Sequence, residues 1–232
     1  TGTINSDTIA YSVSRPGVNT DENAGSYPDA IVAEGSAVQG NYIVTYVPAA
    51  FTITRSNALQ VVPEGVPVEN PDGEGETAEY ELTVIYDGTP HTLSGIPNYP
   101  EGTTVQYSVD GGSTWTTDVP SLTNVGSEDI LIRAVNPNYY DANATGRLRV
   151  LPAQVTVIAN SASKIYGAAD PAFTAQVSGL IGNDTISYTV TRIGNDEAVG
   201  TYPGVITAAG ADAQGNYTVT YESGTLTIRS EE

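Results

Sequence analysis

The sequence predicts an all-β fold of tandem small β-sandwich-like (Ig-like) modules arranged as an elongated rod. Apolar residues alternate with polar ones in short runs bounded by Gly, Asn, Asp and Pro, a pattern typical of half-buried strands. The apolar spacing of a helix face is not sustained anywhere in the sequence, so we expect no helix. The chain also repeats itself, and repeats joined by short linkers favour an extended arrangement.

The two ends of the chain are copies of one unit. The segment Gly2 to Arg15 matches the segment Gly179 to Arg192, and the match continues after a short insertion in the first copy. Both copies contain the motif Gln-Gly-Asn-Tyr. So many identities in the same order do not arise by chance. The identical pairs include Asp7/Asp184, Ile9/Ile186, Tyr11/Tyr188, Asn41/Asn216, Tyr42/Tyr217 and Tyr46/Tyr221.

The middle of the chain is a more distant copy of the same unit. Its Tyr-Asp-Gly motif at 86–88 corresponds to the Tyr-Gly motif at 166–167, and Asn138-Tyr139 corresponds to Asn216-Tyr217. We therefore divide the chain into three repeats, which we call repeats 1, 2 and 3. Repeat 1 (1–55) is truncated at its N-terminus, repeat 2 (56–151) is divergent and carries an acidic insertion at 64–79, and repeat 3 (152–232) is complete.

The strand patterns predict where each repeat begins and ends. Phe51 to Thr54 closes repeat 1, Leu59 to Val62 opens repeat 2, and Leu148 to Leu151 closes it. Linkers this short, one of them containing Pro152, restrict bending. We expect the strands to pair antiparallel in small sandwiches. Those expected in repeat 3 cover Gln154 to Ile158, Phe173 to Val177, Ile186 to Val190, Tyr217 to Tyr221 and Leu226 to Ile228.

Repeat 1 has no counterpart of residues 152–177, so we expect its opening strands to be missing. A sheet without those strands exposes unpaired amides and an apolar face. Repeat 1 should therefore be the least stable repeat, or should borrow a strand from a neighbouring molecule. Because residue 1 is a Thr, we also expect the sequence to be a piece of a longer protein.

Composition excludes several classes of function. The formal net charge of −19 argues against binding to nucleic acid or to an anionic membrane surface. No apolar run is long enough to cross a membrane. There is no Cys, so disulfides, thiolate metal sites and cysteine nucleophiles are excluded, and the single His91 cannot form a cluster of imidazole ligands.

The motifs of repeat 3 resemble the MBG domain of the Tyr-Gly type. They are Lys164-Ile165-Tyr166-Gly167, Asp170 to Thr174, Val199 to Tyr202 and Gly215-Asn216-Tyr217. Repeat 2 looks like the Tyr-Asp-Gly repeats that alternate with these domains. The resemblance implies tandem repeats of large bacterial surface proteins related to mucus-binding adhesins, an extracellular location, and no catalytic residues to carry over.

One acidic segment has the spacing of a calcium loop. Its oxygen ligands would come, in sequence order, from Asn70, Asp72, Glu74, Glu76 and Glu81. The context favours a solvated acidic insertion instead, because Pro71 lies inside the loop and no helix flanks it. We therefore expect no cofactor, and loose calcium binding is the alternative.

Four other features have a structural and a functional interpretation. Ser108 to Trp115 resembles the Asp-box of sialidases, which fixes a hairpin turn and supplies no catalytic group. His91 reads as a surface residue, and Lys164 as a strand-end residue rather than half of an isopeptide crosslink. The recurring tyrosines favour core packing over a sugar-binding platform. Asn41 and Asn216 are expected to bond to nearby backbone in equivalent turns.

These observations predict a non-enzymatic stalk or spacer segment of a bacterial cell-surface adhesin, monomeric and without membrane insertion. The alternative is a module that itself contacts mucin glycans or a host surface protein. A hydrolase would need paired carboxylates in one cleft. Asp7 and Asp184 recur at equivalent positions instead, which is typical of a structural role.

Overall fold

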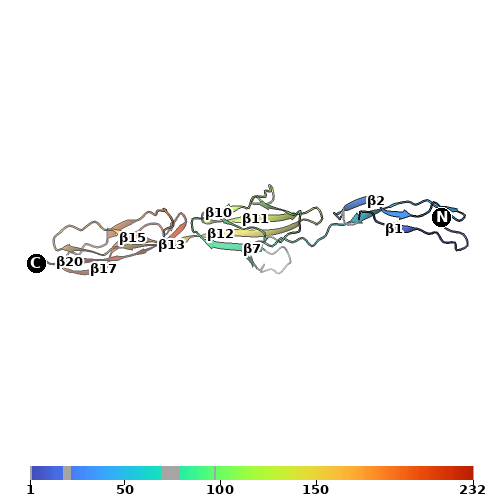
Figure 1. Ribbon diagram of the computed structural model, residues 1–232. Coiled ribbons are helices and arrows are strands. Elements are labelled where there is room, and N and C mark those ends of the chain that lie inside the picture. Colours follow the sequence, from blue (N-terminus) through green and yellow to red (C-terminus); the bar gives the residue numbers. More distant parts are fainter. Residues whose placement is uncertain (1, 18–21, 69–78, 97, 232) are drawn as a thin grey trace.

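The computed structural model describes residues 2–17, 22–68, 79–96 and 98–231 of the chain. Within these residues every regular element is a strand and there is no helix, so the all-β prediction is confirmed. The strands form separate sheets, and each sheet falls inside one of the three repeats. Figure 1 shows the three groups of strands following one another along the length of the molecule, with the two termini at opposite ends.

Repeat 3 is a two-layered sandwich. Alternate residues of its strands, such as Val155, Val157, Ile206, Leu226 and Ile228, are almost completely buried between the two sheets. This alternation is the period-two pattern of the sequence. One sheet has the order β15 (Ala175–Ser178), β13 (Ala153–Ala159), β19 (Tyr217–Glu222) and β18 (Ala213–Gln214); the other has the order β14 (Ala162–Ile165), β20 (Gly224–Arg229), β17 (Gly200–Ala209) and β16 (Thr189–Arg192).

Repeat 2 is built around a five-stranded sheet. Its buried side chains, Leu93, Tyr107, Ile130, Ile132 and Leu148, form a small core of their own. A separate pair of short strands, β8 (His91–Thr92) and β10 (Ser121–Leu122), supplies Leu122 to the edge of this core. The order of the large sheet is β6 (Val66–Val68), β7 (Glu79–Ile85), β12 (Ala142–Leu151), β11 (Gly126–Val135) and β9 (Thr104–Ser108).

Repeat 1 retains only part of the sandwich. Its strands β1 (Ser12–Ser14), β2 (Gly25–Glu34) and β5 (Ala49–Ile53) correspond to β16, β17 and β20, and its hairpin β3 (Val38–Gln39) and β4 (Tyr42–Ile43) corresponds to β18 and β19. The correspondence extends to a register shift in β2 between Tyr27 and Ile31, which matches the shift in β17 between Tyr202 and Ile206.

The described residues of repeat 1 include no buried side chain. Ile31 and Phe51 are half-buried, whereas their counterparts Ile206 and Leu226 are fully buried. The cause is visible in repeat 3, where β13, β14 and β15 complete both sheets and cover these positions. Repeat 1 has no counterpart of these three strands.

The expectation of purely antiparallel pairing was wrong. Three pairs are parallel: β7 with β12, β13 with β19, and β14 with β20. In each pair an early strand of the repeat lies beside a late one, and the long intervening segment provides the crossover that parallel pairing requires.

Two expected strands also differ from those observed. Leu59 to Val62 forms no strand, although Leu59 is buried and the neighbouring Ser56 and Pro63 make isolated bridges. The strand expected from Ile186 begins only at Thr189, because the preceding segment is held by Gln214, whose side chain bonds to both the amide and the carbonyl of Ser187.

Candidate functional site: the junctions between repeats

The contacts that join one repeat to the next centre on Asn138 and Asn216. Each of these residues directly precedes a Tyr, Tyr139 or Tyr217, and each Asn side chain is half-buried. Both side chains bond across the junction to the preceding repeat, which for Asn216 differs from the predicted bonds within its own turn. The left-handed residue of the Gln-Gly-Asn-Tyr turn is Gly215, with a φ of 58°.

At the junction between repeats 2 and 3, Asn216 makes two side-chain hydrogen bonds to repeat 2 and one backbone hydrogen bond within repeat 3. Its Oδ1 accepts from the amide of Val125 at 2.9 Å, and its Nδ2 donates to Asn124 Oδ1 at 3.0 Å. Its backbone carbonyl accepts from the amide of Ala153 at 3.0 Å, directly after the linker. A backbone amide can only donate, so the bond to Val125 fixes the orientation of the Asn216 amide.

The junction between repeats 1 and 2 has the same three bonds. Asn138 Oδ1 accepts from the amide of Ala24 at 2.7 Å, and Asn138 Nδ2 donates to Asn23 Oδ1 at 2.9 Å. The carbonyl of Asn138 accepts from the amide of Ser56 at 2.9 Å. We call this arrangement of one Asn with the Asn-Ala or Asn-Val pair of the preceding repeat the Asn clamp. Its recurrence at both junctions makes it a feature of the repeat plan.

A second contact supports the junction between repeats 2 and 3. Tyr86 of repeat 2 and Tyr217 of repeat 3 both donate to Oδ2 of Asp184, at 2.8 and 2.7 Å. Their rings meet edge to face with centroids 5.6 Å apart, and both side chains are buried. The hydroxyls of Tyr217 and Tyr86 both donate to the charged carboxylate and so lower the pKa of Asp184, with the larger effect from Tyr217. The bond to Asp184 raises the pKa of Tyr86.

The core of repeat 3 therefore continues into repeat 2. Tyr86 and Val150 belong to the same buried cluster as the core of repeat 3, and Val125 and Ile181 pack against it. Gly88 lies so close to Ile181 that an added Cβ would sit 3.1 Å from its Cγ2. Its φ of 79° also favours Gly, so the Tyr-Asp-Gly motif fits this junction both in backbone conformation and in space.

Sequence reasoning found half of this site. It aligned Asn138 with Asn216 and Asp7 with Asp184, but it assigned Asn216 to a turn inside its own repeat and Asp184 to a structural role. It missed Asn23 and Asn124 as partners. The available signal was that both precede the Gly of an equivalent long strand, at Gly25 and Gly126, by two residues.

Lys164 lies in a compact group of charges at one edge of repeat 3. Its Nζ is 2.8 Å from Asp170 Oδ1 and 2.5 Å from Glu197 Oε2, and its side chain is only 5% exposed. Arg192 bonds to the same two carboxylates at 3.0 and 2.8 Å. These four residues, which we call the charge cluster, tie β14 and β16 to the loops beside them. The partners of Lys164 are carboxylates of ion pairs.

The electrostatics of the charge cluster are mutually reinforcing. The bonds to Lys164 and Arg192 lower the pKa of both Asp170 and Glu197. In return, the carboxylates raise the pKa of Lys164 and Arg192. All four groups are therefore held in their charged forms at neutral pH.

The Asp-box segment forms a bonded hairpin turn, as its structural interpretation predicts. Asp110 accepts from the amide and the hydroxyl of Thr114, at 2.9 and 2.6 Å, and from the hydroxyl of Ser108 at 2.7 Å. These bonds, led by those from Thr114, lower the pKa of Asp110 to about 2. Trp115 packs under the guanidinium of Arg133, 4.2 Å from the ring centroid.

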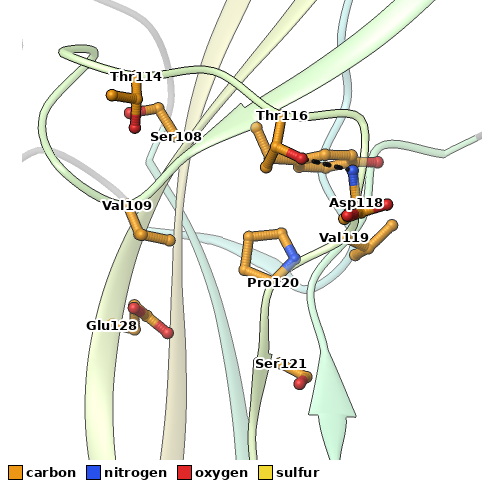
Figure 2. Close-up of a pocket in the computed structure, with 10 residues that line it drawn as sticks. Ser108, Val109, Thr114, Thr116, Asp118, Val119, Pro120, Ser121 and Glu128 are labelled. Carbon is orange, nitrogen blue, oxygen red and sulfur yellow. Dashed lines mark hydrogen bonds between the residues drawn. The ribbon is translucent and has the colours of Figure 1, made fainter.

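A pocket of about 430 Å³ lies beside this hairpin. Figure 2 shows Val109 and Glu128 on one side of the pocket and the loop through Asp118 and Pro120 on the other. The Thr116 hydroxyl accepts from the amide of Asp118 at 3.1 Å. Hydroxyls and two carboxylates line the pocket together with Val109, Val119 and Pro120.

The remaining candidate residues are placed as follows. His91 Nε2 is 2.9 Å from Asp87 Oδ1 and half-buried. Of the calcium-loop residues, Asn70, Asp72, Glu74 and Glu76 lie outside the described residues, and Glu81 lies in β7, where it accepts from the hydroxyl of Thr83. Within the described part of the chain, no group of three or more His, Cys, Asp or Glu side chains could hold a metal ion.

Comparison with known proteins identifies one of the repeats. Residues 155–227 match the MBG domain (YGX type). This match confirms the resemblance inferred from the Tyr-Gly motif, and it covers repeat 3. A comparison with curated proteins finds no match. Among the residues that the structure describes, no helix is long and apolar enough to span a membrane.

Several solved multidomain structures are similar at low TM-scores. Drosophila OTK extracellular domains 3–5 has 10% identity and a TM-score of 0.27, and the match covers 76% of this chain and 68% of that one. Mouse cadherin-23 EC22–24 has 12% identity and a TM-score of 0.27, covering 87% and 74%. SGBP-B of the Bacteroides ovatus mixed-linkage glucan utilization locus, solved in complex with a mixed-linkage heptasaccharide, has 16% identity and a TM-score of 0.23, and the match covers 71% of this chain and 47% of that one.

Proposed function

We propose that this chain is a non-enzymatic stalk segment of a bacterial cell-surface adhesin, whose repeats are held in line outside the cell. The observation that carries the proposal is the Asn clamp, in which the side chain of Asn138 joins repeat 2 to repeat 1, and that of Asn216 joins repeat 3 to repeat 2, through the same two hydrogen bonds. A spacer must resist bending at its junctions, and side-chain bonds between successive repeats oppose that bending. The MBG match supports the assignment to a surface repeat protein.

The chemistry of the described residues supports a structural role. Asp184, which recurs as Asp7, is held by two tyrosine hydroxyls and has a lowered pKa, the opposite of what a general acid needs at neutral pH. In the charge cluster, the carboxylates of Asp170 and Glu197 form ion pairs with Lys164 and Arg192. Cys-free repeats also keep no reactive thiol that extracellular oxidation could modify.

The alternative is a module that itself binds mucin glycans, with the pocket beside Glu128 as the place to test it. Binding of the full chain to immobilised mucin and to a glycan array distinguishes the two, with a scrambled-repeat protein of equal composition as the control. The stalk proposal predicts no saturable binding. Saturable binding that is lost in the Asp118→Ala/Glu128→Ala variant would overturn it in favour of the binding module.

A further inference from the structure

We propose that the outer end of repeat 1 is a second copy of the repeat 3 surface that contacts repeat 2, and that it binds the Tyr-Asp-Gly end of a repeat of the same type as repeat 2. The binding surface consists of Ile4, Asp7, Asn41 and Tyr42. The proposal rests on the proposed function in one respect, because it assumes that repeats of this chain stack end to end.

The surface has the composition of the occupied junction. Ile4, Asp7, Asn41 and Tyr42 are identical to Ile181, Asp184, Asn216 and Tyr217, the residues of repeat 3 that contact repeat 2. All four residues of this junction surface are therefore retained in repeat 1.

The surface is also built in the same geometry. Tyr42 donates to Asp7 Oδ2 at 2.9 Å, as Tyr217 donates to Asp184 Oδ2 at 2.7 Å. The amide of Ile4 donates to the Tyr42 hydroxyl at 2.9 Å, as the amide of Ile181 donates to the Tyr217 hydroxyl at 3.0 Å. The Asp and the Tyr are thus already oriented, and only the second hydroxyl donor, which Tyr86 supplies at the occupied junction, is missing.

Exposure distinguishes the two surfaces. Tyr217 is 4% exposed under repeat 2, whereas Tyr42 is only half-buried, and Ile4 is 66% exposed. Asn41 is exposed, and among the residues that the structure describes its side chain makes no hydrogen bond, while Asn216 bonds to both Asn124 and Val125. An exposed Ile beside an oriented Tyr-Asp pair and an Asn amide matches what the repeat 2 end offers: the ring and hydroxyl of Tyr86, the space above Gly88, and the Asn124 side chain with the Val125 amide.

Cross-linking in a tandem chain tests the proposal. Residues 1–177 of a second copy are placed before Thr1, so that repeat 1 of the full chain receives its opening strands and a repeat 2 in front of them. Because the natural sequence has no Cys, two engineered cysteines are the only thiols. Asn124→Cys in the added copy is paired with Asn41→Cys in the full chain, and a short bismaleimide reagent joins the two where they are close.

Two pairs serve as references. Asn124→Cys with Asn216→Cys in the single chain reports the occupied junction, and Asn124→Cys in the added copy with Asn57→Cys reports random encounter. The proposal predicts that the Asn41 pair cross-links as completely as the Asn216 pair, and that the Asn57 pair does not. If the Asn216 pair reacts and the Asn41 pair does not, the proposal is wrong and the proposed function stands. If neither reacts, both are wrong.

Hydrogen exchange provides a readout without cysteines. In the tandem chain, the amide of Val125 in the added copy should be protected, and Asn41→Ala should speed its exchange roughly fivefold, the effect expected for one lost hydrogen bond. In the single chain, Asn41→Ala should leave the Val125 amide unchanged, because Asn216 holds it. Equal exchange in the tandem chain with and without Asn41→Ala would contradict the proposal.

Discussion

At the residue scale, the clearest result is that Asn138 and Asn216, which are equivalent in the sequence, bond in the same way to the preceding repeat. Alignment of the copies showed that these positions are equivalent. It did not show that their partners lie in another repeat, because equivalence between copies carries no information about which copies touch.

We predict that Asn216→Ala lowers the free energy of unfolding by about 1 kcal/mol, because it removes the acceptor of the Val125 amide at a half-buried site. Chemical denaturation measures the change. Asn41→Ala is the matched control, and it should have no measurable effect in the single chain. Equal losses in both variants would show that Asn216 acts within its own turn, as the sequence suggested.

Asp184 gives the junction a predicted response to acid. Its folded pKa is lowered, so its contribution to stability is present at neutral pH and is lost as the pH falls below the unfolded value of about 3.9 and through the folded value. We expect Asp184→Asn to reduce the acid dependence of unfolding. Identical pH profiles for the wild type and Asp184→Asn would contradict the assignment.

At the element scale, the sequence predicted strands well where apolar and polar residues alternate under a complete sandwich. The prediction was less successful where contacts with distant residues determine the backbone conformation. The segment from Ile186 alternates as a strand should, yet Gln214 takes the hydrogen bonds of Ser187 and the strand begins at Thr189. Parallel pairing of β13 with β19 was not predicted, because alternation has the same period in parallel and antiparallel strands.

The charge cluster predicts two limits to the stability of repeat 3. The lowered pKa values of Asp170 and Glu197 make its contribution disappear as the pH falls below about 4, and the raised pKa of Lys164 makes it disappear as the pH rises beyond about 10.4. Lys164→Met should therefore lower the melting temperature at pH 7 and flatten its decline on both sides. Arg229→Gln, which removes one positive charge outside the cluster, is the control. An unchanged pH profile in Lys164→Met would refute the role of the cluster.

Repeat 1 should open more readily than repeat 3. Its β2 and β5 carry the same register as β17 and β20 but lack the covering strands, so their amides should exchange faster than those of 200–228. Adding residues 152–178 before Thr1 should supply counterparts of β13, β14 and β15 and slow the exchange of 25–53. If these residues are already as protected in the dilute monomer, repeat 1 is complete and the proposed boundary between repeats is misplaced.

At the scale of the whole molecule, repetition and short linkers predicted the succession of three repeats, and Figure 1 shows their sheets following one another along the chain. Sequence reasoning did not find the Asn clamp, because the clamp joins residues about ninety positions apart or more. The central claim is that these clamps hold the repeats in line.

Small-angle X-ray scattering of the full chain, compared with its Asn138→Ala/Asn216→Ala variant, tests that claim most directly. We predict for the wild type a radius of gyration well above the roughly 17 Å of a compact domain of this length, with the scattering of a stiff rod. The double variant should scatter as a jointed chain with a shorter average extension. A wild-type radius of gyration near 17 Å, or the same profile for both proteins, would contradict the account.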